Sequence, residues 1–317
     1  MAAKYAKKSP AYAKKLANEL HAQLTETVEA LVTSDAWPKL LKTMAQRNGT
    51  EIGRYSFQNM LLVLSQCPEA TAVCSFKAWV ERGRASVKGS KSLRIYAPMT
   101  LREKDRDGNV RKTEDGKDRT RVGFRMIPVF DVSQTAPLWQ DPCQGPMFIT
   151  PSVGKPSIVK QLQGKAPEDM WDAVAEQIEN LGYTIERGAT GSAMGYTNPK
   201  NKTVRVSDGV SEAQAAKTLA HELAHILADH VSDLAAYREH RGEAETVAES
   251  VAYMISAYYG MDSVAYSAPY IGTWADKDPE KVMATVQATG KQVLLMFRKF
   301  VTAVESPELE AARLMPV

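Results

Sequence analysis

The sequence predicts an α+β protein of two domains, an N-terminal α/β domain followed by a domain built around a metal-binding helix. Its 317 residues exceed the length of one typical domain. Helical and strand-like periodicities occur in both halves. The charge also divides the chain, because residues 1–150 hold 24 Lys and Arg against 15 Asp and Glu, whereas residues 151–317 hold 16 against 22. A basic first half indicates a polyanionic partner, and the two halves are expected to differ in function.

The composition is that of a globular protein outside the membrane. Hydrophobic residues make up 44% and charged residues 24% of the chain, which are ordinary values for soluble domains. No apolar run approaches the roughly 20 residues of a membrane span, and the basic N-terminus lacks the apolar core of a secretory signal. Cys67, Cys74 and Cys143 are odd in number and form no CxxC pair. We therefore expect a cytoplasmic protein without a membrane partner.

The N-terminal half begins with helices and continues with strands. Apolar residues repeat at helical spacing from Leu16 to Leu31, and a second helix is predicted over Phe57–Leu64. Strands are predicted over 92–98 and 123–132. The intervening residues 102–121 are too polar to pack, so we expect them to form a long solvated hairpin loop.

A proline-rich stretch predicts the boundary between the domains. Six prolines lie within residues 128–156, and prolines of this density are typical of connecting segments. We therefore expect a first domain over 1–133, a linker over 134–156 and a second domain over 157–317.

The second half is predicted to be mainly helical. Helices are expected over 168–182, with Gly182 as its C-terminal stop, over 242–260, and from 279 to about 304. Residues 196–206 read as a β-hairpin, because Asn-Pro and Lys-Asn-Lys turn the chain before an alternating strand.

The segment HELAH, residues 221–225, predicts a catalytic metal site. His221 and His225 are four residues apart, so a helix places both imidazoles on one side. Glu222 follows the first histidine and can reach a water on the open face of the metal, as in the HExxH motif. The alternative interpretation is an ordinary buried helix that carries these polar residues by coincidence.

A third protein ligand is expected from the next helix. Glu243, Glu245 and Glu249 are the candidates there. Glu245 and Glu249 share a helix face, so we expect Glu245 to bind the metal and Glu249 to hydrogen-bond a ligating histidine. Glu243 is expected to be a solvated charge favoured by the helix dipole. His230 and His240 are expected to be surface residues.

Such a site predicts peptide hydrolysis with one zinc ion per chain, although Mn²⁺ or another divalent ion also suits it. Glu222 would accept a proton from the attacking water. The strand TVRV, 203–206, would align an extended peptide by edge pairing. Tyr237, Tyr253 and Tyr270 are candidate donors to the oxyanion.

Cations and aromatic residues alternate over residues 54–98, a pattern that favours binding of single-stranded nucleic acid. The alternative is that the rings are core residues and the cations a solvated surface. The candidate DNA-binding residues are Arg54, Tyr55, Asn59, Trp79, Arg82, Arg84, Lys88, Lys91 and Arg94.

Five segments resemble one known family. RYSFQNMLLVLSQCPEAT (54–71), SFKAWVERGRASVKGSKSLRIYAP (75–98) and GFRMIPVFDVSQT (123–135) resemble the N-terminal domain of ArdC-type antirestriction proteins. KTLAHELAHIL (217–227) and ETVAESVAYMI (245–255) resemble the zincin-like metallopeptidase domain that follows it in that family. The resemblance covers most of the chain.

The resemblance implies a function. Proteins of this family are carried by plasmids and phages, protect incoming DNA from restriction, and bind single-stranded DNA through the N-terminal domain. Their zinc ligands fall here on His221, His225 and Glu245, with Glu222 as the catalytic glutamate. One departure is Ser90, which stands where relatives commonly have an acidic residue.

Three hypotheses follow. In the first, the protein protects DNA from restriction by coating single strands, and the peptidase domain is active or auxiliary. In the second, it is a regulatory metalloprotease that cleaves a repressor or a restriction-related protein, with DNA binding auxiliary. In the third, the zinc is purely structural, and Glu222 argues against this because a structural site needs no general base.

Overall fold

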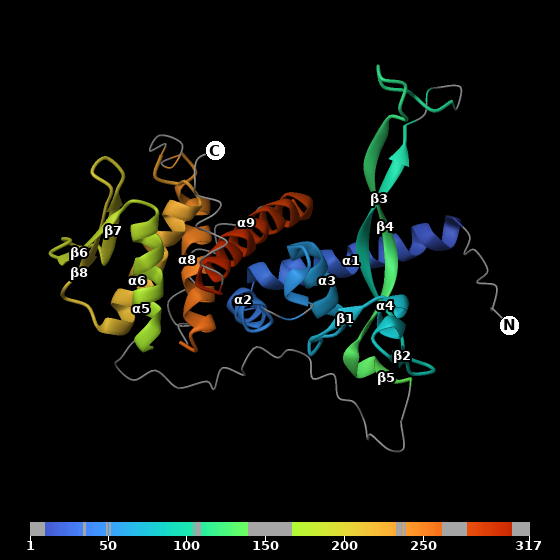
Figure 1. The fold of residues 1–317 in the computed structure, drawn as a ribbon, viewed down its shortest axis with the longest axis horizontal. Coiled ribbons are helices and arrows are strands. Elements are labelled where there is room, and N and C mark those ends of the chain that lie inside the picture. Colours follow the sequence, from blue (N-terminus) through green and yellow to red (C-terminus); the bar gives the residue numbers. More distant parts are fainter. Residues whose placement is uncertain are drawn as a thin grey trace. The chain divides into compact units, whose positions relative to one another are not determined.

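The computed structural model describes residues 10–33, 36–48, 50, 52–103, 105, 109–138, 167–232, 237, 239–261 and 278–305. Its contacts divide the chain into two compact units, formed by residues 1–24 with 50–152 and by residues 25–49 with 153–317. The division is therefore not a single cut in the chain. Helices and strands occur in both units (Figure 1), which confirms the predicted α+β class with two domains.

The first unit is built on a three-stranded antiparallel sheet in the order β1–β4–β3. Its strands are β1 (Val73–Cys74), β3 (Leu93–Arg102) and β4 (Thr120–Asp131). Helix α3 (Phe57–Gln66) begins at Ser56, whose hydroxyl accepts a hydrogen bond from a backbone N–H in the first turn. Its buried residues Met60, Leu61 and Leu62 form much of the core. The predicted helix and both predicted strands are thus confirmed.

The first unit also contains part of a long helix and several short elements. Helix α1 (Pro10–Thr33), predicted from its periodicity, is confirmed, and its residues up to Leu24 belong to this unit. Strand β5 (Thr135–Pro137) pairs antiparallel with β2 (Arg84–Ser86). These first residues of the expected linker therefore form a strand, whereas residues 139–156 lie outside the described residues. The other short elements are η1 (Ile52–Arg54), α4 (Phe76–Glu81) and η2 (Val132–Gln134).

The β3–β4 hairpin is longer than expected. Residues 102–121 were expected to form a solvated loop, but the ladder runs through Arg102 and Thr120, and an isolated bridge joins Lys112 to Asp118. Opposite charges face each other across the strands: Arg102 pairs with Asp118 at 3.1 Å, and Arg119 pairs with Glu103 at 3.2 Å. Cross-strand ion pairs of this kind favour continued pairing of a polar hairpin. In the sequence, the same alternating charges resemble a solvated loop, so the additional pairing was not predicted.

The second unit combines helices with a small mixed sheet. Strand β8 (Thr203–Ser207) lies in the centre, parallel to β6 (Thr184–Gly188) and antiparallel to β7 (Gly195–Asn198). The β7–β8 hairpin was predicted and β6 was not. The helices are α5 (Glu168–Asn180), α6 (Glu212–Leu227), α8 (Arg241–Tyr258) and α9 (Pro279–Glu305). All four match the predicted helical segments, and Gly182, just beyond α5, has the positive φ of a helix stop.

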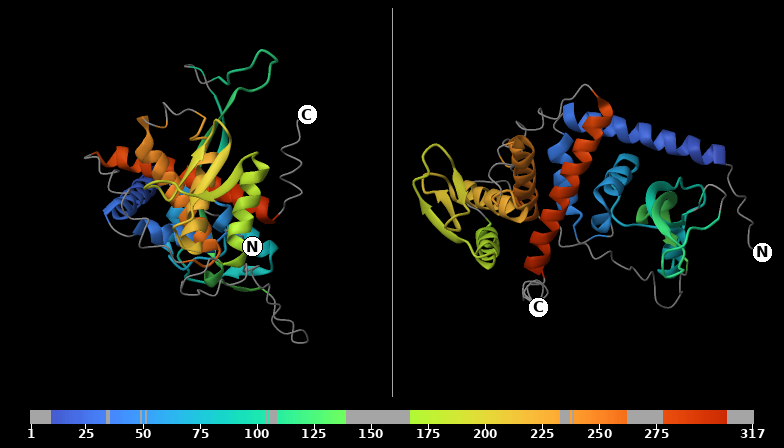
Figure 2. Two further views of the ribbon diagram at one scale, coloured as in Figure 1. Left: turned by 90° about the vertical axis from the view of Figure 1, so that its left-hand side faces the viewer. Right: turned by 90° about the horizontal axis from the view of Figure 1, so that it is seen from above.

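Helix α2 (Ala36–Gln46), which was not predicted, completes the core of this unit. The indole N–H of Trp37 donates a 3.1 Å hydrogen bond to Ser250 of α8, and both residues are buried. Helices α8 and α9 lie side by side (Figures 1 and 2), with Tyr258 against Phe297 at 6.1 Å between ring centroids. Helix α8 is consequently buried over most of its length. In the described part of the chain, no helix is long and apolar enough to cross a membrane.

Candidate metal centre

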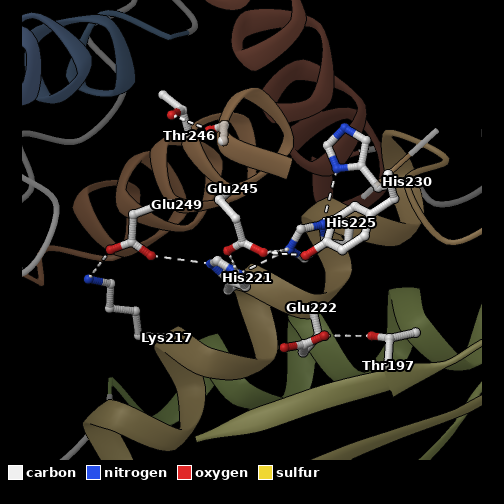
Figure 3. Close-up of polar contacts among 11 residues, drawn as sticks. Thr197, Lys217, His221, Glu222, His225, His230, Glu245, Thr246 and Glu249 are labelled. Carbon is white, nitrogen blue, oxygen red and sulfur yellow. Dashed lines mark hydrogen bonds and ion pairs between the residues drawn. The ribbon is translucent and has the colours of Figure 1, made fainter. Parts of the chain in front are cut away.

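Helix α6 presents the HExxH residues because its apolar face is fixed in the core. Ser211 caps its N-terminus, and the helix runs without a break through His221 and His225. Leu219 and Leu223 are fully buried, so they lie on the face of the helix that packs in the core. The face that carries His221 and His225 points towards α8 (Figure 3). The spacing of four residues predicts that the two histidines share this face.

The structure brings the three predicted ligands together. Nε2 of His221 lies 3.1 Å from Nε2 of His225. The carboxylate of Glu245 lies 3.4 Å from the first nitrogen and 3.7 Å from the second. A tetrahedral ion with ligands at about 2.0–2.1 Å requires ligand atoms roughly 3.3 Å apart. Two imidazoles and one carboxylate at these separations therefore fit a tetrahedral metal with one open position.

Glu249 and Lys217 form a chain of polar contacts behind His221. Nδ1 of His221 lies 3.2 Å from Glu249, and the other oxygen of Glu249 lies 2.7 Å from the ammonium of Lys217 (Figure 3). Lys217 and Glu249 are both buried. A carboxylate at Nδ1 sets the tautomer that leaves Nε2 free for a metal. Lys217 was missed by sequence reasoning, although it lies one turn before His221 on the same helix.

The other two ligand candidates also have partners. Nδ1 of His225 lies 3.1 Å from Nδ1 of His230, and the hydroxyl of Tyr237 donates a hydrogen bond to Glu245. His230 is half-buried rather than fully exposed, because the turn after α6 folds back and the backbone N–H of His230 donates to the backbone oxygen of His225 at 3.0 Å. His240 is exposed, as expected.

Glu222 is buried on the opposite side of the cluster from Glu249 (Figure 3). The hydroxyl of Thr197 on β7 donates a 2.7 Å hydrogen bond to its carboxylate. Gly195 makes this approach possible, because a Cβ there would lie 2.6 Å from the methyl group of Thr218. Strand β7 can therefore lie close to α6 only with glycine at this position.

The carboxylates of the cluster stabilise the positive charge of His221. Burial opposes the charged form of His221, but hydrogen bonds to Glu245 and Glu249 outweigh it and raise its pKa to about 10. Burial raises the pKa of Glu245, yet hydrogen bonds from His221 and Tyr237 overcome this and lower it to about 2. Burial likewise raises the pKa of Glu249, but His221 and Lys217 outweigh it and lower this pKa. The ionised carboxylates of Glu245 and Glu249 thus stabilise the charged form of His221.

For His225 and Glu222, in contrast, the pKa shifts in the direction that burial favours. Burial, assisted by the charge of His221, lowers the pKa of His225 to about 3. Burial raises the pKa of Glu222, against the opposing effects of His221 and Thr197. A neutral imidazole is the form that binds metals, and a carboxylate with a raised pKa is a better proton acceptor.

A cleft of about 160 Å³ opens beside the cluster, lined by α6, α8 and the start of β7. The expected role of residues 203–206 as an edge strand is wrong. They lie in β8, which is paired on both sides, whereas β7 forms the edge next to the cleft. The alternation of these residues indicates burial of one face but carries no information on sheet order.

The three tyrosines suggested as oxyanion donors have different surroundings. Tyr253 is fully buried within α8, which removes it from the cleft. The hydroxyl of Tyr237 already donates to Glu245. Tyr270 lies outside the described residues. Neither Tyr237 nor Tyr253 lines the cleft.

Three of the predicted DNA-binding residues hold the first unit together. The hydroxyl of Tyr55 donates to the backbone of β1 at 2.7 Å, and the buried indole of Trp79 donates to the backbone of β4 at 2.8 Å. The amide of Asn59 both donates to and accepts from the backbone of Tyr96, at 2.8 and 2.9 Å. These side chains are occupied by structural contacts.

Two of the six predicted cations donate side-chain hydrogen bonds within the first unit. Arg82 donates to the sulfur of Cys74 at 2.9 Å, and Arg84 donates twice to Thr135, at 2.8 and 2.9 Å. The other four have no ion pair within the described residues: Arg54, Lys88, Lys91 and Arg94.

Two family models match successive parts of the chain. Residues 11–130 match the family model of the N-terminal domain of the anti-restriction factor ArdC. Residues 185–277 match the model of the IrrE N-terminal-like domain of the M78 peptidases. An uncharacterized Bacillus anthracis protein is 26% identical over 254 residues, which cover 71% of this chain and 41% of that protein. The chain thus spans less than half of this relative.

Two solved structures also match. They are the metal-free and the Mn(II)-bound antirestriction protein ArdC from the R388 plasmid, each 17% identical to this chain. The metal-free structure gives a TM-score of 0.47, covering 77% of this chain and 84% of that chain. The Mn(II)-bound structure gives 0.45, covering 76% and 83%. The two family matches, in this order along one chain, show that the protein has the ArdC-type antirestriction architecture, an ArdC N-terminal domain followed by an M78 peptidase-like domain.

Proposed function

We propose that the chain is an antirestriction protein of a mobile genetic element, cytoplasmic in its host, that binds single-stranded DNA and carries a zinc peptidase. The observation that carries the enzymatic part is the cluster of His221, His225 and Glu245 beside Glu222 and an open cleft. A purely structural site would be closed by a fourth protein ligand and would need no carboxylate in its cleft.

Each residue of the site would have a separate role in hydrolysis. His221, His225 and Glu245 would hold the metal, which when bound supplies Lewis acidity to a carbonyl and to a water. Glu222 would accept the proton of the attacking water, since burial raises its pKa. Thr197 holds the carboxylate of Glu222 in place. The free edge of β7 would align an extended peptide by backbone pairing.

The donor set favours zinc among divalent ions. Two imidazoles and one carboxylate with an open position are the ligand set of hydrolytic zinc sites. Mn²⁺ or another divalent ion would also accept these nitrogen and oxygen donors. We expect one ion per chain, bound by the described cluster of the second unit.

The DNA-binding part rests on the first unit. Lys88 and Lys91 lie in the exposed turn between β2 and β3, and Arg54 is exposed as well. Cations without ion pairs are available to phosphates. We expect affinity for a single strand to fall steeply with salt and to depend little on base sequence.

A second candidate function is a regulatory metalloprotease that cleaves a repressor or a restriction-related protein. The hydrogen bond from Thr197 to Glu222 favours it, because protection by coating DNA alone would not require an oriented carboxylate in a cleft. In this case, DNA binding would be auxiliary.

Transfer of unmodified plasmid DNA into a restricting host tests both functions. Wild type should raise the yield of transformants, and a host without restriction serves as the control. If Glu222→Gln keeps this protection, coating of DNA is sufficient; if Glu222→Gln abolishes it, proteolysis is the mechanism. His240→Ala, an exposed histidine outside the cluster, should behave as wild type. Absence of protection by wild type would contradict the antirestriction proposal itself.

A further inference from the structure

The outer half of the β3–β4 hairpin exposes an unusual apolar surface. Val122 and Phe124 are 69% and 68% exposed, more than any other large hydrophobic residue of the described chain. They lie opposite Thr100 and Pro98 in the ladder, so these four side chains share one face. This end of the hairpin projects away from β1, α4 and the β2–β5 pair (Figure 1).

The charge of the two strands is positive. They contain four arginines and one acid, Asp131, which is buried at the base of the sheet. Arg102 is neutralised by Asp118 at 3.1 Å. Arg121 and Arg125 are exposed and have no ion pair within the described residues. Two uncompensated cations therefore flank Phe124 along β4.

The edge of β4 is open at this end. Strand β1 pairs only with Phe130 and Asp131, so the outer part of β4 has β3 on one side and no neighbour among the described residues on the other. Successive side chains point to opposite faces. A ligand lying along this edge would meet Val122 and Phe124 on one face, with Arg121 and Arg125 reaching it from the other.

This combination determines the partner's chemistry. The ring of Phe124 can stack on a flat or apolar group, and the guanidinium groups of Arg121 and Arg125 can bind anions. Single-stranded DNA offers both at every nucleotide, whereas duplex DNA keeps its bases stacked inside. A purely apolar protein surface would leave both arginines without a counter-charge. We propose that the outer β3–β4 hairpin binds single-stranded DNA, with Phe124 stacking on a base and Arg121 and Arg125 contacting phosphates.

The inference rests on the proposed binding of single-stranded DNA and locates it on a surface outside the sequence-predicted residues. The test uses the full chain and a fluorescein-labelled oligothymidine, whose anisotropy is followed at several salt concentrations. Phe124→Ala should weaken binding about tenfold, the usual loss of one stacked base. Phe76→Ala, which truncates another exposed ring of the first unit, 49% exposed on α4, should leave the affinity unchanged.

The arginines are tested by the salt dependence. Arg121→Ser with Arg125→Ser should weaken binding and reduce the slope of log affinity against log salt by about 1.4, the contribution of two phosphates of a single strand. Lys77→Ser, which removes a cation already paired with Glu81, should leave the slope unchanged. All of these side chains are exposed, so we expect each variant to have the melting temperature of wild type. This measurement checks that each variant is folded.

The outcomes separate this inference from the proposed function. If wild type does not bind the oligonucleotide, the DNA-binding function and the inference both fail. If wild type binds and neither hairpin variant differs from it, only the inference fails. If Phe124→Ala instead converts an oligomer to a monomer in sedimentation without changing DNA binding, the surface is a contact between copies of the chain, and the inference is overturned.

Discussion

At the scale of single residues, each metal-ligand candidate has its own partner. Glu249 contacts His221, His230 contacts His225, and Tyr237 donates to Glu245. Such partners orient the ligands, and their loss usually weakens metal binding without abolishing it. The contacts therefore predict how strongly each substitution weakens metal binding, which the identity of the ligands alone does not.

The first prediction separates a ligand from its partner. Glu245→Ala should lose most of the bound metal, because one of three ligands is removed. Glu249→Ala should retain the metal with an affinity lowered about 10–100-fold. Metal analysis after dialysis and competition with a chromophoric chelator measure the two effects. The double variant His221→Ala with His225→Ala serves as the metal-free reference, and the reverse ranking would make Glu249 the ligand.

The second prediction concerns Lys217. Its ammonium contacts the carboxylate that contacts His221, so it should act on the metal only through Glu249. Lys217→Met should lower zinc affinity, and the same change in a Glu249→Gln background should have little further effect. Chelator competition on the four proteins of this double-mutant cycle gives the coupling. Additive losses would show that Lys217 does not act through Glu249.

At the scale of elements, the position of β7 against α6 depends on one glycine. A Cβ at Gly195 would lie 2.6 Å from Thr218 and 3.0 Å from the backbone oxygen of Arg205. Both neighbours would have to move, and the second is backbone. Because β7 also carries Thr197, any displacement of the strand reaches Glu222.

The third prediction follows from this contact. Gly195→Ala should lower the free energy of unfolding by about 1–3 kcal/mol, the usual cost of overpacking, as measured by urea denaturation. Gly188→Ala on β6 is the matched control, because a Cβ there meets no atom within 4 Å. Equal stability of the two variants would show that β7 can move away from α6 without cost.

At the scale of the whole molecule, the two units are not consecutive in sequence. Residues 25–49 belong with the C-terminal half, and Trp37 is buried against Ser250. A fragment that begins after the proline-rich stretch would therefore lack part of its own core. The same packing buries α8, which carries Glu245 and Glu249.

The fourth prediction tests this arrangement. Trp37→Ala should destabilise the second unit by about 3–5 kcal/mol, the range for a buried aromatic residue, and should reduce metal retention although it lies far from the motif in sequence. Calorimetry with metal analysis measures both effects. Gln46→Ala on the exposed side of α2 is the control. An unchanged unfolding transition of the second unit would show that α2 is not part of its core.

The sequence by itself determined what depends on local spacing. The i, i+4 spacing of His221 and His225 predicts their common helix face, and the periodic segments predict the long helices, because these patterns follow from the geometry of one helix. Only the tertiary structure decided which distant groups meet. The ion pair of Lys217 with Glu249, the central place of β8 and the structural contacts of Trp79 and Asn59 all join residues far apart in the chain. No local pattern encodes such contacts, because burial and pairing are set by the packing of whole elements.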